Sequence, residues 1–290
     1  MRTNTGQVLY IPRIGQRADF QHPLMRGCVG WWPLNDGAGT KAVDLSANGN
    51  DGTQSGGVGW DSTTRGTAAD FDGVDDRFDL TNLGMDFSSD DFTVSMWIYV
   101  DSISSPEYLW VKQTSGNSFS CIFWFNTATT LQLIHFTSAS ACMAQYTIAS
   151  SLVGGWNHLV ATDVSPSSLL SSNKAVYLNG ELLTPDSSAN GTGIITESSG
   201  TLSLAGRISD NLRQLSGDYQ NVRVYNRALS PTEILELYTN PWAGLQPLTT
   251  STRYFYFPPR PLSETIGTFK MRNLSFTPKS GGRTIIKRGP

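Results

Sequence analysis

Residues Phe92 to Val100 read FTVSMWIYV, and this stretch decides the fold class. Its alternate residues are all apolar, so Val94, Met96 and Ile98 share one face of an extended chain with the two end residues. Strict alternation of this kind is typical of a strand that covers a hydrophobic core with one face. We therefore predict a β-strand over residues 92–100.

Stretches of the same kind recur along the chain, separated by turns rich in Gly, Asn, Asp and Ser. Residues 118–125 carry apolar side chains on both faces, which indicates a strand that is covered on both sides. Asn179-Gly180 is a strong signal for a two-residue hairpin turn, because such a turn needs positive φ at both positions. The further strands that we predict are 118–125, 131–136, 157–163, 174–178, 181–183, 201–205 and 221–225.

One short helix is predicted near the end of this region. Ser230 can cap it, Pro231 suits the first helical position, and Glu233 completes a Ser-x-x-Glu capping box. Asn240-Pro241 then ends the helix. A long run of strands followed by a single helix predicts an all-β sandwich of two antiparallel sheets.

The composition excludes several classes of protein. No run approaches the roughly 18 apolar residues of a membrane span, and residues 1–10 lack the apolar core of a secretory signal. We therefore expect synthesis in a cytoplasm without a signal peptide. Three cysteines, Cys28, Cys121 and Cys142, are an odd set without metal-ligand spacing, so we expect small buried apolar residues rather than a disulfide framework.

Several motifs in order resemble one family, the laminin G-like, concanavalin A-like jelly-roll domains of the pentraxin-related subtype, which are common in bacteria and phages. The resemblance covers roughly residues 28–240 and implies the fold, whereas the family includes lectins, adhesion modules, glycosidases and structural subunits. The motifs that carry it are GWWPLNDGAG at 30–39, DLSANGN at 44–50, ADFDGVDD at 69–76, the strand at 92–100, GWNHLV at 155–160, YLNG at 177–180, and VRVYNRALS at 222–230 with Gly217 and Glu233-Ile234.

The charge distribution divides the chain into three parts. Residues 28–244, the predicted domain, carry 22 carboxylates and nine Lys or Arg, a net charge of −13. Residues 1–27 carry a net charge of +3, and residues 245–290 carry eight Lys or Arg against one Glu, a net charge of +7. We predict an acidic jelly-roll domain with a basic N-terminal arm and a basic, aromatic C-terminal arm.

The C-terminal arm contains four consecutive aromatic residues, Tyr254-Phe255-Tyr256-Phe257, followed by two prolines. In an extended segment these side chains point to both sides, and one domain surface covers only one side. Either the arm folds back on its own domain or it docks on neighbouring subunits. We predict the second, with the four aromatic residues as anchors and Arg253, Arg260, Arg272 and Arg283 as charged contacts.

These features favour a structural protein of a phage virion, to which the resemblance also points. We predict a non-enzymatic capsid decoration or cement protein that is held on the shell by its extended arms and forms a homo-oligomer on the lattice. Its partners are then capsid or other virion proteins, and its location is the virion. The alternative is a carbohydrate-binding or adhesion module on a phage tail, a fibre or a cell surface.

Catalysis has no support in the sequence. Concanavalin A-like glucanases need two carboxylates that alternation places on one face of a strand, as in Glu-x-Asp-x-Glu, and no glutamate here has that spacing. His22, His135 and His158 lie far apart in the sequence and have no nucleophile motif beside them. We therefore predict that the protein is not an enzyme.

Calcium is the one metal that the sequence suggests. Asp44, Asn48 and Asn50 stand at even spacings in a turn and offer the oxygen ligands that Ca²⁺ prefers. A second acidic stretch runs from Asp70 to Asp76. The alternative for both is that these side chains stabilise turns. The resemblance implies an aspartate two residues before Val222, and Gln220 stands there instead, which weakens the case for an ion.

Glycans and nucleic acid are two further candidate ligands. Glycan binding needs exposed aromatic side chains, and the candidates are Trp31, Trp32, Trp60, Trp97, Trp110, Trp124 and Trp156, of which several lie in packing motifs. The basic, aromatic C-terminal arm could contact nucleic acid, but a domain with a net charge of −13 repels it. Glycans are therefore a candidate ligand, and we expect that nucleic acid does not bind.

Overall fold

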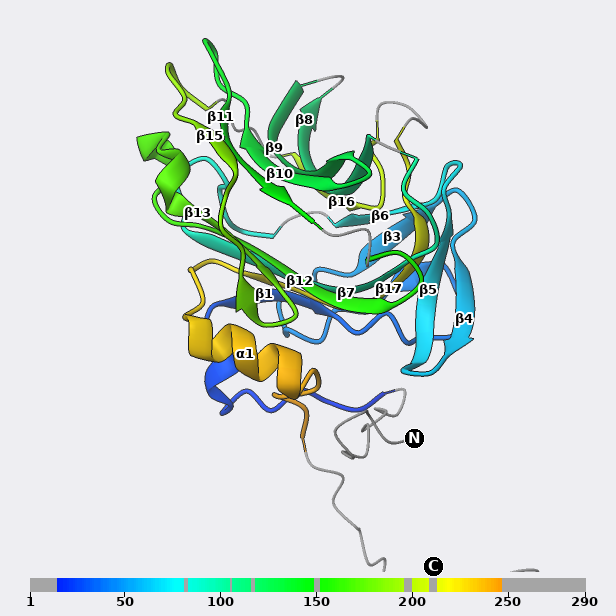
Figure 1. The fold of residues 1–290 in the computed structure, drawn as a ribbon. Helices are drawn as coiled ribbons and strands as arrows, with labels where there is room; N and C mark the ends of the chain where they lie inside the picture. Colours follow the sequence, from blue (N-terminus) through cyan, green and yellow to red (C-terminus); the bar gives the residue numbers. More distant parts are fainter. Residues whose placement is uncertain are drawn as a thin grey trace, which may run out of the picture. The chain divides into compact units, whose positions relative to one another are not determined.

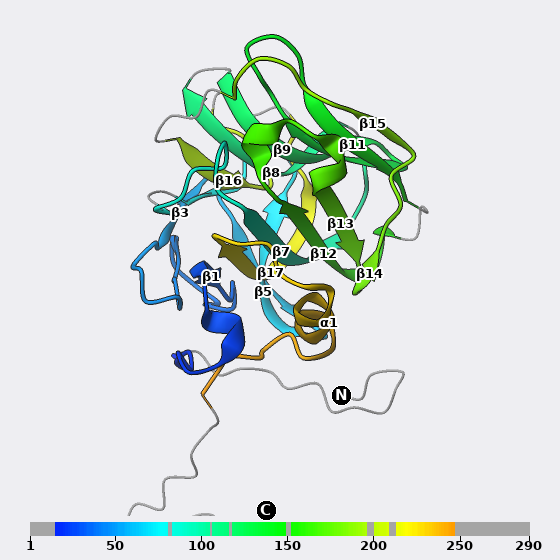
Figure 2. The same ribbon diagram turned by 90° about the vertical axis from the view of Figure 1, so that its left-hand side faces the viewer.

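The chain divides into two compact units, Met1–Gln246 and Pro247–Pro290. The computed structural model describes residues 15–80, 83–104, 106–115, 118–148, 152–195, 200–208 and 213–246, without the side chains of residues 114, 115 and 118. Within this part of the chain, two antiparallel β-sheets face each other, as Figures 1 and 2 show from two directions. The predicted all-β sandwich is confirmed.

The first sheet has eight strands and carries the helix on its outer side (Figure 1). In order across the sheet the strands are β14 (Glu181–Leu182), β13 (Lys174–Leu178), β12 (Trp156–Asp163), β7 (Phe92–Val100), β17 (Ser216–Tyr225), β5 (Gly66–Asp72) and β4 (Gly59–Thr63), with β1 (Cys28–Trp32) beside β17.

The second sheet has nine strands and forms the other layer of the sandwich. In order across the sheet they are β15 (Ser187–Ala189), β11 (Cys142–Thr147), β10 (Thr130–His135), β9 (Ser118–Thr127), β8 (Glu107–Ser115), β16 (Thr201–Leu204), β6 (Arg77–Leu80), β3 (Gly52–Ser55) and β2 (Lys41–Ala42).

The predicted strands correspond to observed ones, and residues 92–100 and 174–178 have the predicted bounds. The hairpin turn is also confirmed, since Asn179 and Gly180 have φ of 53° and 84°. The predicted ranges include none of the strands β1 to β6, nor β8, β11 or β15. In β8 the register shifts between Tyr108 and Trp110, and this bulge interrupts the alternation that marks a strand in the sequence.

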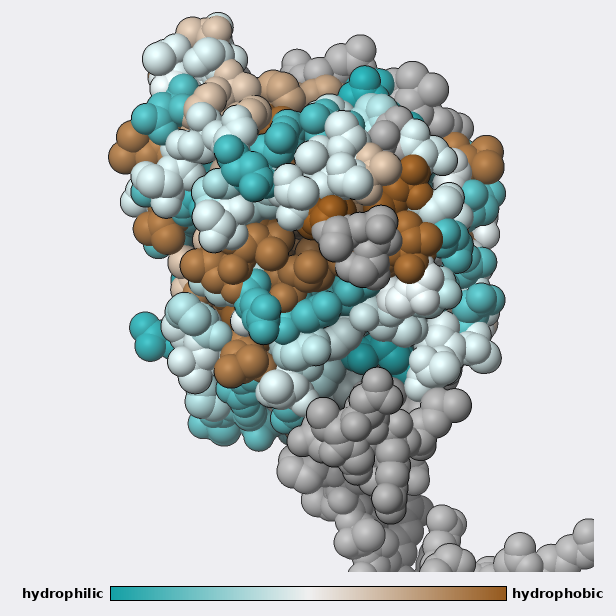
Figure 3. All heavy atoms as spheres, in the orientation of Figure 1, coloured by the Kyte–Doolittle hydropathy of each residue, from teal (hydrophilic) through white to brown (hydrophobic). Residues whose placement is uncertain are grey.

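The main core lies between the two sheets and consists of the side chains that alternate inward from both. Figure 3 shows hydrophobic residues gathered in a band across the middle of one face, at the level where the sheets in Figure 1 face each other. Large side chains that are wholly buried there include Trp32, Phe71, Phe78, Phe87, Phe92, Trp110, Phe123, Phe125 and Tyr219. Cys28, Cys121 and Cys142 are all buried, as predicted.

The helix α1 (Pro231–Thr239) begins and ends where the sequence predicts. The Ser230 hydroxyl accepts a hydrogen bond from the main-chain nitrogen of Glu233, whose carboxylate accepts one from the main-chain nitrogen of Ser230. Ile234 and Leu237 of α1 are buried against the outer face of the eight-stranded sheet. Short 3₁₀ helices in the described part of the chain include Pro23–Met25, Pro166–Ser168 and Ser171–Asn173.

Both ends of the described chain lie side by side beneath this helix (Figure 1). The main-chain nitrogen of Asp19 donates to the carbonyl of Gly244 at 2.6 Å, and that of Gln246 donates to the carbonyl of Arg17 at 2.9 Å. Ala18, Leu24 and Met25 are buried, so residues 18–25 of the predicted N-terminal arm pack on the domain. No helix in the described residues is long and apolar enough to cross a membrane.

Candidate functional site

A row of four residues crosses the outer face of the nine-stranded sheet. Tyr108 of β8 is the register partner of Trp124 of β9, which is the partner of Gln132 of β10, which is the partner of Gln145 of β11. Register partners project from the same face of a sheet. The neighbouring residues Phe123, Phe125, Leu131 and Leu133 belong to the core between the sheets, so this polar–aromatic row faces away from it.

Hydrogen bonds link the polar–aromatic row from strand to strand. The rings of Tyr108 and Trp124 are stacked, with centroids 5.7 Å apart and planes 14° from parallel. The Nε1 of Trp124 donates to Oε1 of Gln132 at 3.0 Å, and Nε2 of Gln132 donates to Oε1 of Gln145 at 2.5 Å. The indole is therefore held in one orientation, and the amide group of the half-buried Gln145 ends the series.

Arginines lie over the aromatic end of the row. The guanidinium carbon of Arg213 lies 5.4 Å from the ring centroid of Trp124 and 5.9 Å from that of Tyr108, and its Nη1 donates to the Tyr108 hydroxyl at 3.1 Å. Arg207 lies 5.5 Å from the ring centroid of Phe119. Arg213 is exposed, whereas Trp124 and Phe119 are half-buried. The surface thus brings aromatic faces, planar amides and positive charge close together in space.

The outer face of the eight-stranded sheet carries a different row, called here the acidic row. Trp156, Tyr99, Asp218 and Asp70 are successive register partners across β12, β7, β17 and β5. Desolvation by burial, together with the negative charges of Asp70 and other nearby aspartates, raises the pKa of Asp218 to about 7. This row therefore has a charge that changes near neutral pH.

The predicted calcium ligands lie together in the turn after β2. The carboxylate of Asp44 accepts hydrogen bonds from the main-chain nitrogens of Trp31, Ser46 and Asn50 at 2.8–2.9 Å. The side-chain nitrogens of Asn48 and Asn50 donate to the carbonyl of Val29 at 3.1 and 2.8 Å. These contacts tie the turn to β1. Calcium binding by this group stays a prediction.

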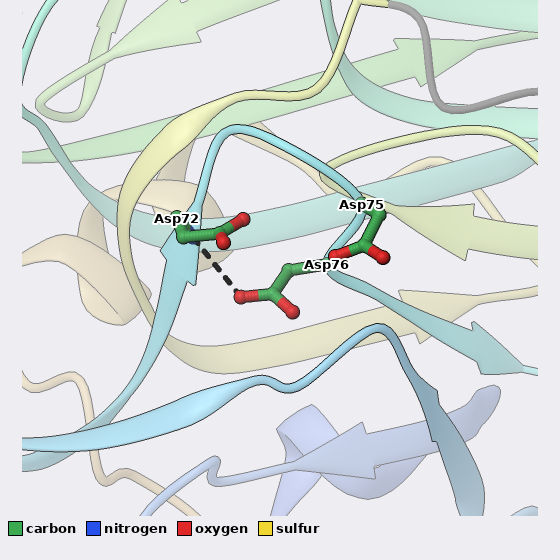
Figure 4. A group of neighbouring side chains, drawn as sticks. All are labelled: Asp72, Asp75 and Asp76. Carbon is green, nitrogen blue, oxygen red and sulfur yellow. Dashed lines mark hydrogen bonds between the residues drawn. The ribbon is translucent and has the colours of Figure 1, made fainter.

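The second acidic stretch forms a tighter group, shown in Figure 4. Carboxylate oxygens of Asp72, Asp75 and Asp76 all lie within 4.8 Å of one another in the loop between β5 and β6. Asp76 also accepts hydrogen bonds from the main-chain nitrogens of Asp72 at 3.0 Å and Gly57 at 2.5 Å. Asp76 therefore ties its loop to the turn between β3 and β4, as the turn-stabilising alternative expects.

The histidines of the sheets are buried. His158 stacks on Trp97, with ring centroids 5.1 Å apart, and its Nε2 lies 2.9 Å from the Ser95 hydroxyl. Burial lowers the pKa of His158 to about 3, so it is neutral at physiological pH. His135 lies in the main core, and His22 lies near Glu236 of α1.

The predicted partner-binding residues lie outside the described part of the chain. They are Tyr254, Phe255, Tyr256, Phe257, Arg253, Arg260, Arg272 and Arg283. Trp124 is one of seven tryptophans that the sequence offers as glycan contacts, and no sequence signal singles it out. Gln132, Gln145 and Arg213 are not predicted, because only the tertiary structure and the register of the neighbouring strands show that they lie close to Trp124.

The family model described as the concanavalin A-like lectin/glucanases superfamily, of laminin G type, matches residues 72–235. The chain belongs to this superfamily. No curated protein matches the sequence. The match to the family model confirms the fold that the motifs predict.

Solved structures with the same fold come from toxins and from carbohydrate-active enzymes. The binding domain of Paraclostridial Mosquitocidal Protein 1 has a TM-score of 0.58 and 16% identity over 74% of this chain and 52% of that chain. Domain 4 of AbnA, an extracellular arabinanase from Geobacillus stearothermophilus solved in complex with arabinotriose, has a TM-score of 0.52 and 17% identity over 73% of this chain and 98% of that domain. Trypanosoma rangeli sialidase in complex with sialic acid has a TM-score of 0.54 and 16% identity over 83% of this chain and 36% of that chain. The chain thus spans about half of the toxin domain and about a third of the sialidase.

Proposed function

We propose that this protein is a non-catalytic carbohydrate-binding module that binds glycans on the outer face of its nine-stranded sheet. The polar–aromatic row carries the proposal, because the indole of Trp124 is half-buried, stacked on Tyr108 and held by Gln132. Protein sites for small polar ligands combine flat apolar contacts with a few fixed polar groups. A pyranose or furanose ring has the same character, with apolar C–H faces and a rim of hydroxyls.

The related structures support the same class of ligand. Domain 4 of the arabinanase, which this chain matches over nearly the whole of that domain, was solved with arabinotriose. At 17% identity the likeness shows that the two domains share a fold. The absence of catalysis is also part of the proposal, since the row contains no carboxylate, whereas glycoside hydrolysis needs two.

Two tryptophans allow a matched test. Trp124 and Trp156 are both half-buried and lie on the outer faces of opposite sheets. A glycan array that includes arabino-oligosaccharides is probed with the whole chain and with the variants Trp124→Ala and Trp156→Ala. We expect Trp124→Ala to weaken binding at least about 30-fold, as for a central aromatic contact, and Trp156→Ala to leave it unchanged. Binding that survives Trp124→Ala, or no binding on the array, would overturn the proposal.

A second candidate function rests on the C-terminal arm. Residues 245–290 carry a net charge of +7 and four consecutive aromatic residues. We propose that this segment fastens the domain to a larger protein assembly, of which a phage capsid shell is the candidate that the sequence favours. In that case the chain lacking residues 245–290 folds normally but no longer joins virions. Full occupancy of the truncated chain on particles would exclude this role.

A further inference from the structure

Three reactive side chains meet in the main core, on the end of the sandwich where β12 leads into β13. Asp163 is the last residue of β12 and Lys174 the first residue of β13, and the two are register partners. His135 reaches them from β10 of the opposite sheet. Asp163 and His135 are wholly buried, and Lys174 is 5% exposed. The proposed glycan site uses none of them.

The reactive atoms of this cluster are in direct contact. Nζ of Lys174 contacts Oδ2 of Asp163 and lies 2.9 Å from Nδ1 of His135. The same Nδ1 lies 3.2 Å from Oδ2 of Asp163. An amine, a carboxyl group and an imidazole nitrogen therefore form a closed triangle.

The hydrogen bonding of His135 determines which of its nitrogens can accept a proton. Nε2 lies 3.1 Å from the carbonyl oxygen of Phe87, which can only accept a hydrogen bond, so Nε2 carries the ring proton. Burial lowers the pKa of His135, which leaves the ring neutral. Nδ1 then has a free lone pair directed at Lys174 and can take a proton from Nζ.

The surroundings disfavour a permanent ion pair. The ring of Phe92 lies 5.8 Å from that of His135 and 4.7 Å from that of Phe87, so the cluster is packed among aromatic side chains. Oδ1 of Asp163 is buried and has no hydrogen-bond partner in the described structure. In a low dielectric a carboxylate with an unpaired oxygen is costly, and conversion of the pair to a neutral group relieves that cost.

We propose that Lys174 and Asp163 become joined by an isopeptide bond that the folded protein forms by itself. Nδ1 of His135 takes a proton from the ammonium group of Lys174, and the freed amine attacks Cγ of Asp163. The new N–Cγ bond replaces the bond from Cγ to Oδ2, and Oδ2 leaves as water with two protons that pass from Nζ through His135. One ammonium and one carboxylate become one neutral amide and one water, so charge and atoms balance without an added reagent.

Such a bond would cross-link neighbouring strands. It would close the loop of residues 164–173 between β12 and β13 and remove two buried charges. A covalent closure of this kind slows unfolding, because the loop can no longer open. A module that acts outside a cell would gain resistance to heat and proteases.

Mass spectrometry of the whole chain tests the proposal without any variant. We expect an intact mass below that of the sequence by one water, and a branched tryptic peptide in which Lys174 and Asp163 are joined. Asp-Gly pairs such as Asp36-Gly37 and Asp51-Gly52 also lose water when they cyclise, so the position of the loss must be mapped. An unchanged mass, or a loss that maps only to Asp-Gly pairs, would overturn the proposal.

Variants test the role of each side chain. Lys174→Met and Asp163→Ala should both keep the full mass of their own sequences. His135→Gln should lose the water more slowly after synthesis than the natural chain. The control is Lys41→Met, because Lys41 pairs with an aspartate on the surface with 69% of its side chain exposed. The control should lose one water like the natural chain. Water loss at the Lys174–Asp163 pair at an unchanged rate in His135→Gln would exclude the histidine as the proton carrier.

Discussion

The indole nitrogen of Trp124 donates a hydrogen bond to Oε1 of Gln132 across the β9–β10 pair at 3.0 Å. This contact directs one edge of the indole along the sheet and leaves its ring stacked on Tyr108. A flat aromatic side chain that is fixed in advance binds a sugar ring with little loss of side-chain entropy. The proposed glycan site depends on this arrangement.

Gln132→Leu should weaken glycan binding about 5- to 10-fold, because loss of a neutral hydrogen bond costs roughly 1 kcal/mol. The affinity is measured by titration calorimetry with the best glycan from the array. Gln54→Leu is the matched control, since Gln54 donates to the Val58 carbonyl elsewhere in the same sheet. If both variants bind like the natural chain, Gln132 does not position the indole.

Asp218 should make the fold less stable as the pH rises from about 4 to about 7. Its pKa is raised from 3.8 to about 7 in the folded protein, so the folded state binds more protons than the unfolded state between these values. The neutral Asp218→Asn variant should therefore raise the melting temperature at pH 8 and change it little at pH 4. Thermal unfolding at the two pH values checks this prediction, and an equal effect at both would contradict it.

Asp61→Asn should have a smaller effect of the same kind on the melting temperature. Asp61 is exposed, and its negative charge contributes to the raised pKa of Asp218. The variant should shift the melting temperature at pH 8 in the same direction by a smaller amount. A larger effect than that of Asp218→Asn would mean that the acidic row is not centred on Asp218.

Arg223 should fix residues 241–243 against the eight-stranded sheet. Its buried guanidinium donates to the carbonyls of Pro241 and Ala243, both at 2.9 Å, and lies 3.8 Å from the ring centroid of Trp31. Arg223→Met leaves both carbonyls without this donor, so we expect a loss of about 3 kcal/mol in the free energy of unfolding. Denaturant unfolding measures it, and limited proteolysis should show faster cleavage at residues 241–246. The exposed Arg26, changed to Met, is the control.

The cap of α1 gives a prediction of smaller size. Ser230→Ala removes the hydroxyl that accepts from the nitrogen of Glu233, which should cost about 1 kcal/mol in the free energy of unfolding. Ser230→Asp restores an acceptor and should recover most of the loss. Urea denaturation of the two variants beside the natural chain separates these outcomes. Equal loss in both would show that the cap contributes nothing.

The fold could be predicted from the sequence where local signals agree with the tertiary structure. The strand at 92–100 alternates along its whole length, and Ser230, Pro231 and Glu233 mark the start of the helix with backbone chemistry that needs no distant partner. The proposed glycan site could not be predicted, because it depends on the register of neighbouring strands. Tyr108 faces outward only because a bulge follows it in β8, and Gln145 joins the row only because β11 pairs with β10.

The measurement that tests the proposed glycan site most directly is an NMR titration of the indole N–H signals with arabinotriose and with the best glycan from the array. The Trp124 signal is assigned by its absence from the Trp124→Phe variant, and that of Trp156 in the same way. We predict that the Trp124 signal shifts and saturates with the ligand while the Trp156 signal stays in place. A ligand that binds but shifts only Trp156, or shifts neither signal, would contradict it.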